Sequence, residues 1–202
     1  MADLTFVYGT MGSAKTAQAL ITKYNHEEHG RSVWLIKPAA DTRDGDGMLK
    51  SRLGIEAEVV MIADDQDIFK LFEELTRRPD IVIADEGNLF TAKHIDQMRQ
   101  IVDEANTNVV VYGLRTDFQT KLFPSSRRLM ELADNIKKIH NLCDCGNEGE
   151  VNARFDADGK IVTTGEQVLI GGNESYHSVC FRCYNDLLRR QLDGIDDQYY
   201  RT

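Results

Sequence analysis

The sequence is short of positive charge: 24 lysine and arginine residues face 33 aspartate and glutamate residues, which leaves a formal net charge of −9. Gripping DNA or RNA irrespective of sequence needs a basic face, so this balance argues against a nucleic-acid partner. Long apolar runs are also missing, and no stretch approaches membrane-spanning length. The chain enters an apolar strand pattern close to Met1, so we expect no signal peptide, no membrane partner and a cytoplasmic location.

Cysteine is missing from the first two thirds of the chain, and the four cysteines form two close pairs near its end. The pairs are Cys143-x-Cys145 and Cys180-x2-Cys183. Two such pairs separated by a spacer are typical of a structural zinc site with four thiolate ligands. Buried free thiols are the alternative, which is disfavoured because packing alone rarely places cysteines in two close pairs.

What is present is an ordinary globular composition, with 202 residues of which 42% are hydrophobic and 28% charged. This length suits one full domain plus a small appendage. Five apolar runs predict strands: Leu4–Tyr8, Val33–Ile36, Val59–Ile62, Ile81–Ala84 and Val109–Tyr112. Helical patterns at 17–24, 68–77 and 95–106 separate several of them. The alternation predicts an α/β fold, with a mainly parallel sheet flanked by helices.

A phosphate-binding loop (P-loop) is indicated directly after the first predicted strand. Its positions are Gly9, Thr10, Met11, Gly12, Ser13, Ala14, Lys15 and Thr16. The backbone N–H groups of such a turn, with the positive end of the following helix, bind phosphate. Lys15 would reach the outer phosphates of ATP and Thr16 would ligate Mg²⁺, whereas a tight turn without ligand is the alternative. Ala14 replaces the usual glycine, so the loop distorts if this position is left-handed.

Two acidic residues follow the predicted strand Ile81–Ala84. Asp85 is placed like the carboxylate that holds Mg²⁺ in nucleotide-binding ATPases and kinases. Glu86 could act as a general base on a hydroxyl group or water. The alternative is a helix cap, but ligands of α/β sheets bind at the carboxyl ends of strands, where the predicted phosphate loop also lies.

Two more predicted strands are followed by candidate site residues. Arg43, two residues after Asp41, could neutralise a phosphoryl group during its transfer, because a guanidinium matches phosphate oxygens. A solvated charge pair is the alternative. Phe118 and Phe123 could line an apolar slot for a planar base, although core packing is the commoner role of phenylalanine.

The texture of the sequence changes at Cys143, where glycine, asparagine and acidic residues replace the long apolar runs. Strand-like pieces at 151–155, 160–163 and 167–170 are followed by a helical pattern at 181–191. We therefore predict a P-loop nucleotide-binding domain over residues 1–141, a zinc-binding domain over 142–192 and a flexible acidic tail over 193–202.

Taken in order, these motifs resemble the type II thymidine kinase family from Gly9 to Cys183. The resemblance rests on Met11, Lys37-Pro38, Asp41-Thr42-Arg43, Asp85-Glu86, Gly113-Leu114, Phe118, the four cysteines, Gly171-Gly172 and Glu174-Ser175-Tyr176. Ala14, Asn88, Leu89, Arg115 and the C-x-C spacing depart from the commoner family pattern. None of these departures removes a catalytic group.

The resemblance implies phosphorylation of the 5′-hydroxyl of thymidine by Mg²⁺-ATP to give dTMP, with a structural zinc ion. It implies that Glu86 takes the hydroxyl proton, that Arg43 stabilises the phosphoryl group and that Asp41 supports the site. The thymidine-binding residues it implies, partly in a substrate-covering lasso of the zinc domain, are Met11, Leu114, Phe118, Phe123, Gly171, Gly172 and Tyr176. Members of the family are typically homotetramers that the end product dTTP inhibits.

Two other functions stay open from the residues alone. One is a regulatory nucleotide-binding ATPase whose zinc domain docks a partner, although the presence of Glu86 favours catalysis. The other is a kinase for a different deoxynucleoside, such as deoxyuridine or a deoxycytidine analogue.

Overall fold

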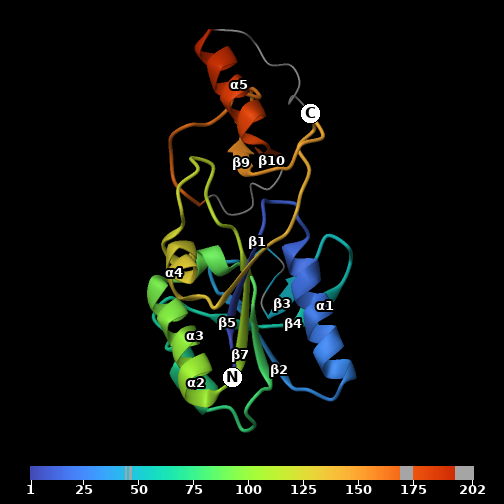
Figure 1. Ribbon diagram of the computed structural model, residues 1–202, viewed down its shortest axis with the longest axis vertical. Coiled ribbons are helices and arrows are strands. Elements are labelled where there is room, and N and C mark those ends of the chain that lie inside the picture. The colour runs from blue at the N-terminus through green and yellow to red at the C-terminus, as the bar shows by residue number, and fades with distance from the viewer. Residues whose placement is uncertain (44, 46, 169–174, 194–202) are drawn as a thin grey trace. The chain divides into compact units, whose positions relative to one another are not determined.

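The computed structural model describes residues 1–43, 45, 47–168 and 175–193 (Figure 1). The chain divides into two compact units, and each is described by itself. The sheet unit comprises Met1–Tyr8, Ala14–Arg115 and Phe123–Lys138. The cysteine unit comprises Gly9–Ser13, Thr116–Leu122 and the chain from Ile139 on. Residues 9–13 of the predicted phosphate loop therefore group with the cysteine unit, and residues 14–16 with the sheet unit.

The sheet unit is built on six parallel strands in the order β5-β2-β6-β7-β1-β8. They are β1 (Leu4–Tyr8), β2 (Val33–Pro38), β5 (Val60–Ile62), β6 (Ile81–Ala84), β7 (Asn108–Gly113) and β8 (Asn135–Lys138). Every residue of β6 is buried, as expected for a central strand covered on both faces. The predicted α/β fold with a mainly parallel sheet is confirmed.

Helices cover both faces of this sheet (Figure 1). On one face the core joins strand residues to α2 (Ile68–Glu73), α3 (Ala92–Ala105) and α4 (Pro124–Leu132). Val111 belongs to that core, so its neighbour Tyr112 points to the opposite face. There the Tyr112 hydroxyl lies 2.9 Å from Thr22 Oγ1 of α1 (Lys15–Glu28), which covers the second face.

Several elements of the sheet unit differ from what the apolar runs of the sequence predict. The hairpin of β3 (Met48–Lys50) and β4 (Glu56–Glu58) is antiparallel, and half of its strand residues are charged. β8 is an edge strand of sequence Asn-Ile-Lys-Lys that is mostly exposed, so it lacks the apolar run that marks a buried strand. α2 ends at Glu73 rather than at Arg77. None of the described helices is long and apolar enough to cross a membrane.

The cysteine unit contains the antiparallel pair β9 (Val151–Arg154) and β10 (Tyr176–Val179), followed by α5 (Phe181–Leu192). Its small core holds Cys143, Cys180, Val151, Val179, Tyr184 and Leu187, among others. The predicted strand at 160–163 is reduced to an isolated bridge between Phe155 and Ile161. The predicted strand at 167–170 lies partly, and the tail after Asp193 wholly, outside the described residues.

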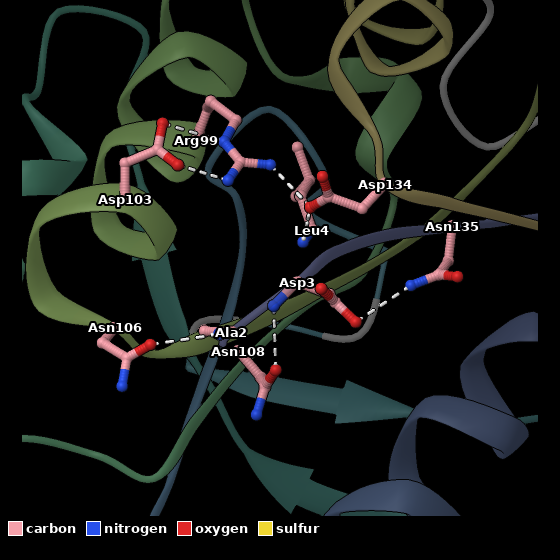
Figure 2. Close-up of polar contacts among 9 residues, drawn as sticks. All are labelled: Ala2, Asp3, Leu4, Arg99, Asp103, Asn106, Asn108, Asp134 and Asn135. Carbon is pink, nitrogen blue, oxygen red and sulfur yellow. Dashed lines mark hydrogen bonds and ion pairs between the residues drawn. The ribbon is translucent and has the colours of Figure 1, made fainter.

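Side chains of α3, of residues 106–108 and of Asp134 hold the chain near the amino ends of β1, β7 and β8 (Figure 2). The backbone N–H groups donate to side-chain oxygens as follows: Ala2 to Asn106 at 3.1 Å, Asp3 to Asn108 at 3.0 Å and Leu4 to Asp134 at 2.8 Å. Arg99 donates to Asp134 at 2.6 Å and also to Asp103. The N–H groups of Ala2, Asp3 and Leu4 at the start of β1 are thus paired, which serves stability rather than chemistry.

Candidate active site

Asp85 and Thr16 meet at the carboxyl end of β6. Thr16, in the first turn of α1, donates its hydroxyl to Asp85 Oδ2 at 2.7 Å. Asp85 is 1% exposed, and its Oδ1 is buried with no hydrogen-bond donor among the described residues. Burial, and then the negative charge of Glu86, raises the pKa of Asp85 to about 7. A carboxylate oxygen without a donor beside a threonine hydroxyl fits a hard cation, so these residues suit the Mg²⁺ that accompanies ATP.

Lys15 precedes Thr16 and is also buried, with 8% of its surface exposed. Burial lowers the pKa of Lys15, although the charges of Glu86 and Asp85 act in the opposite direction. A cation held among these carboxylates is pre-placed for a polyanionic ligand, since a bound phosphate would add the negative charge that keeps it protonated.

Arg43 joins two segments of the predicted site. Its Nε donates to Asp41 Oδ1 at 2.6 Å, and its Nη2 donates to Glu86 Oε1. Asp41 Oδ2 in turn lies 3.6 Å from Nζ of the fully buried Lys37. Burial alone would raise the pKa of Asp41, but Arg43 and then Lys37 outweigh it and hold that pKa below its usual value. Burial alone would lower the pKa of Arg43, but Glu86 and then Asp41 outweigh it and raise that pKa above its usual value.

The backbone at Glu86 is left-handed, with φ 50° and ψ 43°. A non-glycine residue in this region carries a cost of about 1–2 kcal/mol. The neighbourhood is crowded as well, because a Cβ atom at Gly87 would lie 2.5 Å from Val111 Cγ1. At Gly113 it would lie 3.0 Å from the backbone nitrogen of Asn88. Because the two glycines have no Cβ atom, the chain after β6 can pack closely against the end of β7. Glu86 lies at this close contact, directly before Gly87.

Asn88, one of the departures from the family pattern, has a definite structural role. Its Oδ1 accepts a hydrogen bond from the N–H of Leu114 at 2.8 Å. On the other side, Ser126 Oγ donates to the Leu114 carbonyl at 2.6 Å. Leu114 is thereby held through both of its peptide groups. Asn88 was noticed in the sequence only as a departure, and Ser126 carried no signal there, because both contacts depend on tertiary structure.

Ala14 adopts the left-handed conformation, with φ 61° and ψ 29°, directly before α1. Glycine is preferred in this region of backbone conformation, so Ala14 meets the left-handed condition under which the sequence predicts strain in the loop. Arg115, another departure, lies with its guanidinium carbon 5.1 Å from the ring centroid of Tyr8.

In the cysteine unit, residues 9–13 are held by three polar side chains. Thr10 Oγ1 lies 2.7 Å from Ser178 Oγ, and the N–H of Met11 donates to Asn152 Oδ1 at 2.7 Å. Asn141 Nδ2 donates to Thr10 Oγ1 and to the Met11 carbonyl, each at 3.0 Å. The Met11 N–H thus already has Asn152 as its acceptor. The sequence offered no signal for Asn141, Asn152 or Ser178.

Two of the predicted base-binding aromatics belong to the cysteine unit. Phe118 is 1% exposed, and the guanidinium carbon of Arg154 lies 5.2 Å from its ring centroid. The same carbon lies 5.9 Å from the ring centroid of Tyr176, which opens β10. Phe123, at 4% exposure, and Leu114 belong to the sheet unit. Gly171 and Gly172 lie outside the described residues.

The four cysteines converge, with all four Sγ atoms within 4.8 Å of one another. Cys145 Sγ lies 3.5 Å from Cys143 Sγ and 3.7 Å from Cys180 Sγ. Tetrahedral zinc with bonds of about 2.3 Å would separate its sulfur ligands by roughly 3.8 Å. A hydrogen bond from the Asn147 backbone, followed by the neighbouring thiols, lowers the pKa of Cys145 to about 6, whereas hydrogen bonding with Cys145 raises the pKa of Cys183. The cluster therefore fits a closed structural zinc site.

Comparison with known proteins covers both units. A family model described as thymidine kinase matches residues 2–184. A thymidine kinase of Rhizobium etli is 41% identical over 190 residues, which are 92% of this chain and 94% of that protein. A thymidine kinase of Streptococcus pyogenes serotype M3 is 40% identical over 91% of this chain and 97% of its own. One of Listeria monocytogenes serotype 4b is 37% identical with the same coverage of each chain.

Proposed function

The chain belongs to the thymidine kinase family, and we propose that it transfers the terminal phosphoryl group of ATP to the 5′-hydroxyl of thymidine, yielding dTMP and ADP. The family match supports the substrates. The observation that carries the chemistry is the group of Thr16, Asp85, Glu86 and Arg43 at the carboxyl ends of the strands. It unites a metal-binding carboxylate, a second carboxylate and a guanidinium, which are the parts that phosphoryl transfer requires.

Each of these side chains has a proposed task. Glu86 accepts the proton of the 5′-hydroxyl as the oxygen attacks phosphorus, so the nucleophile gains negative charge only when it is needed. Arg43 lies beside Glu86 and can stabilise the charge of the phosphoryl group as it moves, while Asp41 fixes the orientation of the guanidinium. Lys15 binds the outer phosphates. Thr16 and Asp85 would hold Mg²⁺, which would supply positive charge against the phosphates.

Other residues are proposed from the family resemblance. Residues 9–14 would enclose the phosphates, and Met11, Leu114, Phe118, Phe123 and Tyr176 would contact the nucleoside, together with Gly171 and Gly172. The cysteine cluster would hold zinc as a fold-stabilising ion. Four cysteines without a disulfide, and the use of ATP, are in keeping with a cytoplasmic location.

The reaction is tested by following labelled phosphate from the γ position of ATP into thymidine, deoxyuridine, deoxycytidine and water. We expect Mg²⁺-dependent formation of dTMP at a rate well above that of any other product. ATP hydrolysis without a nucleoside monophosphate would instead support a regulatory ATPase, and preference for another nucleoside would correct the substrate.

Two further properties are proposed from the family alone. The enzyme would be a homotetramer, which light scattering of the purified protein can measure directly. dTTP would inhibit it as the end product, competing with the nucleoside in steady-state assays. A monomer in solution, or activity unaffected by millimolar dTTP, would contradict these respective proposals.

A further inference from the structure

Asn152 on β9 contacts two segments of the cysteine unit at once. Its Oδ1 accepts the hydrogen bond from the Met11 N–H at 2.7 Å, and its Nδ2 donates to the carbonyl of Thr116 at 3.0 Å. The side chain is 3% exposed, so water cannot replace these partners. The oxygen that accepts from Met11 and the nitrogen that donates to Thr116 belong to one planar amide group. The Asn152 side chain therefore sets the distance between the Met11 and Thr116 peptides.

Ser178 stands directly opposite Asn152 in the β9–β10 pair, so both side chains project from the same face. Ser178 contacts Thr10, the neighbour of Met11. A Cβ atom at Gly149 would collide with Ser178 Oγ, which shows that the chain leaves room for this hydroxyl. In the described part of the chain, the Ser178 side chain hydrogen-bonds only to the phosphate-loop segment, whereas the Asn152 side chain bonds to two segments.

Thr116 begins a compact turn that carries Phe118. The turn closes through the bridge between Thr116 and Leu122 and through the hydrogen bond from the Asp117 N–H to the Lys121 carbonyl at 2.9 Å. The Tyr184 hydroxyl donates to the carbonyl of Phe118 at 3.1 Å. A turn held in this way moves as a piece, so a shift at Thr116 would displace Phe118 as well.

We propose that Asn152 is a positioning residue that couples the Thr10–Met11 part of the phosphate loop to the Thr116–Leu122 turn. It sets the binding conformations of the ATP segment and the nucleoside segment together. This inference rests on the proposed function for the roles of Met11 and Phe118. It concerns a residue that touches neither the reacting atoms nor the metal ligands.

Steady-state kinetics of three variants test the coupling. Asn152→Ala removes both bonds and should raise the KM for ATP and the KM for thymidine by roughly tenfold each, with a smaller change in kcat. Ser178→Ala loses the contact with Thr10 and should raise the KM for ATP alone. Gln191→Ala is the matched control, because Gln191 Nε2 donates to the Ile161 carbonyl at 3.1 Å in the same unit without contacting either segment. Both KM values should stay normal in this control.

A fourth variant separates positioning from general loss of structure. In Asn152→Asp the ionised carboxylate can still accept from Met11 but repels the Thr116 carbonyl, whereas the neutral carboxyl accepts and donates like the native amide. Position 152 is 3% exposed, and burial raises the pKa of a carboxyl placed there above its usual value of about 3.9. The KM defects of this variant, taken relative to wild type at the same pH, should therefore shrink as the pH falls from 8 to 5. Asn152→Ala should show no such recovery.

The possible results separate this inference from the function it rests on. A wild-type protein that does not phosphorylate thymidine overturns the proposed function. If wild type is active, unchanged KM values in Asn152→Ala overturn the inference, as do equal losses in Gln191→Ala. So does a defect of Asn152→Asp that does not depend on pH. Thermal unfolding and zinc content of each variant identify any that has lost its fold, and the Asn152→Asp pH series then decides.

Discussion

The two ends of the same parallel sheet are built in opposite ways. At the amino ends, the N–H groups of Ala2, Asp3 and Leu4 each reach a side-chain oxygen, and Arg99 pairs with two carboxylates. At the carboxyl ends, one oxygen of Asp85 is buried with no hydrogen-bond donor in the part of the chain that the structure describes. Glu86 also has a left-handed backbone there. The polar groups at the amino ends stabilise the fold, whereas those at the carboxyl ends are placed to bind a ligand.

This difference explains why the site residues cannot be judged by stability alone. A buried carboxylate oxygen that lacks a hydrogen-bond donor destabilises the ligand-free protein. The same oxygen contributes favourable free energy when a cation binds to it. Removing such a group should therefore cost activity and restore stability. Removing a group at the amino ends should do the reverse. The variants below are ordered from the largest expected effect to the smallest.

Glu86→Gln should lower kcat by roughly 10²–10⁴-fold, because the amide cannot take the proton of the 5′-hydroxyl. Nucleotide binding should persist, since the amide oxygen can still accept from Arg43. Initial rates at saturating ATP and thymidine measure the loss. Glu104→Gln, the same change at a glutamate that pairs with Gln100 on α3, is the control and should be fully active. Near-normal turnover in Glu86→Gln would remove Glu86 from the role of base.

Asp85→Asn should stabilise the metal-free protein at pH 8, by up to about 4 kcal/mol for a folded pKa of about 7 against 3.8 in a model peptide. Because the pKa of Asp85 is raised in the folded protein, the neutral carboxyl contributes fully to the free energy of unfolding below about pH 4. This contribution is lost as the pH rises through 7. Urea unfolding in EDTA from pH 4 to 8 measures it. Wild type should lose stability over this range and the variant should not; parallel curves would contradict the assignment.

Asp134→Ala should destabilise the protein by about 1–2 kcal/mol with kcat unchanged, because the Leu4 N–H and Arg99 lose their acceptor. The Leu4 N–H and Arg99 hold the pKa of Asp134 below its usual value. Its contribution is therefore present above about pH 4 and lost as the pH falls, opposite to that of Asp85. Urea unfolding at pH 7 measures the loss. Asp96→Ala, which breaks an exposed pair with Arg128, should cost less and serves as control.

Ala14→Gly should raise stability by about 1 kcal/mol, because glycine adopts the left-handed backbone of this position without the steric cost of Cβ. The same substitution at Ala19, inside α1, should lower stability by at least a similar amount. Thermal unfolding of the two variants side by side measures the opposite signs. A loss of stability in both would show that Ala14 carries no backbone strain.

The sequence predicted the sheet well where strands are buried on both faces. The bounds of β1 and β6 agree with their apolar runs, because a covered parallel strand needs a continuous apolar stretch. β8 and α4 escaped prediction, since an exposed edge strand and a short helix rich in serine and arginine carry a weak apolar signal.

The site divides in the same way. Asp85, Glu86 and Arg43 could be found because chemistry at the carboxyl ends of parallel strands follows from topology, and the structure brings these residues together. Asn152 and Ser178 could not, because a single polar residue has no periodic signature. Their partners lie 141 and 168 positions away in the chain.

The most direct test of this contrast measures kcat and the free energy of unfolding on the same preparations of Glu86→Gln and Asp134→Ala. We predict that Glu86→Gln loses at least about 100-fold in kcat with its stability kept. Asp134→Ala should lose about 1–2 kcal/mol of stability with its kcat kept. If each variant loses activity and stability together, the two ends of the sheet do not divide these tasks and the account is wrong.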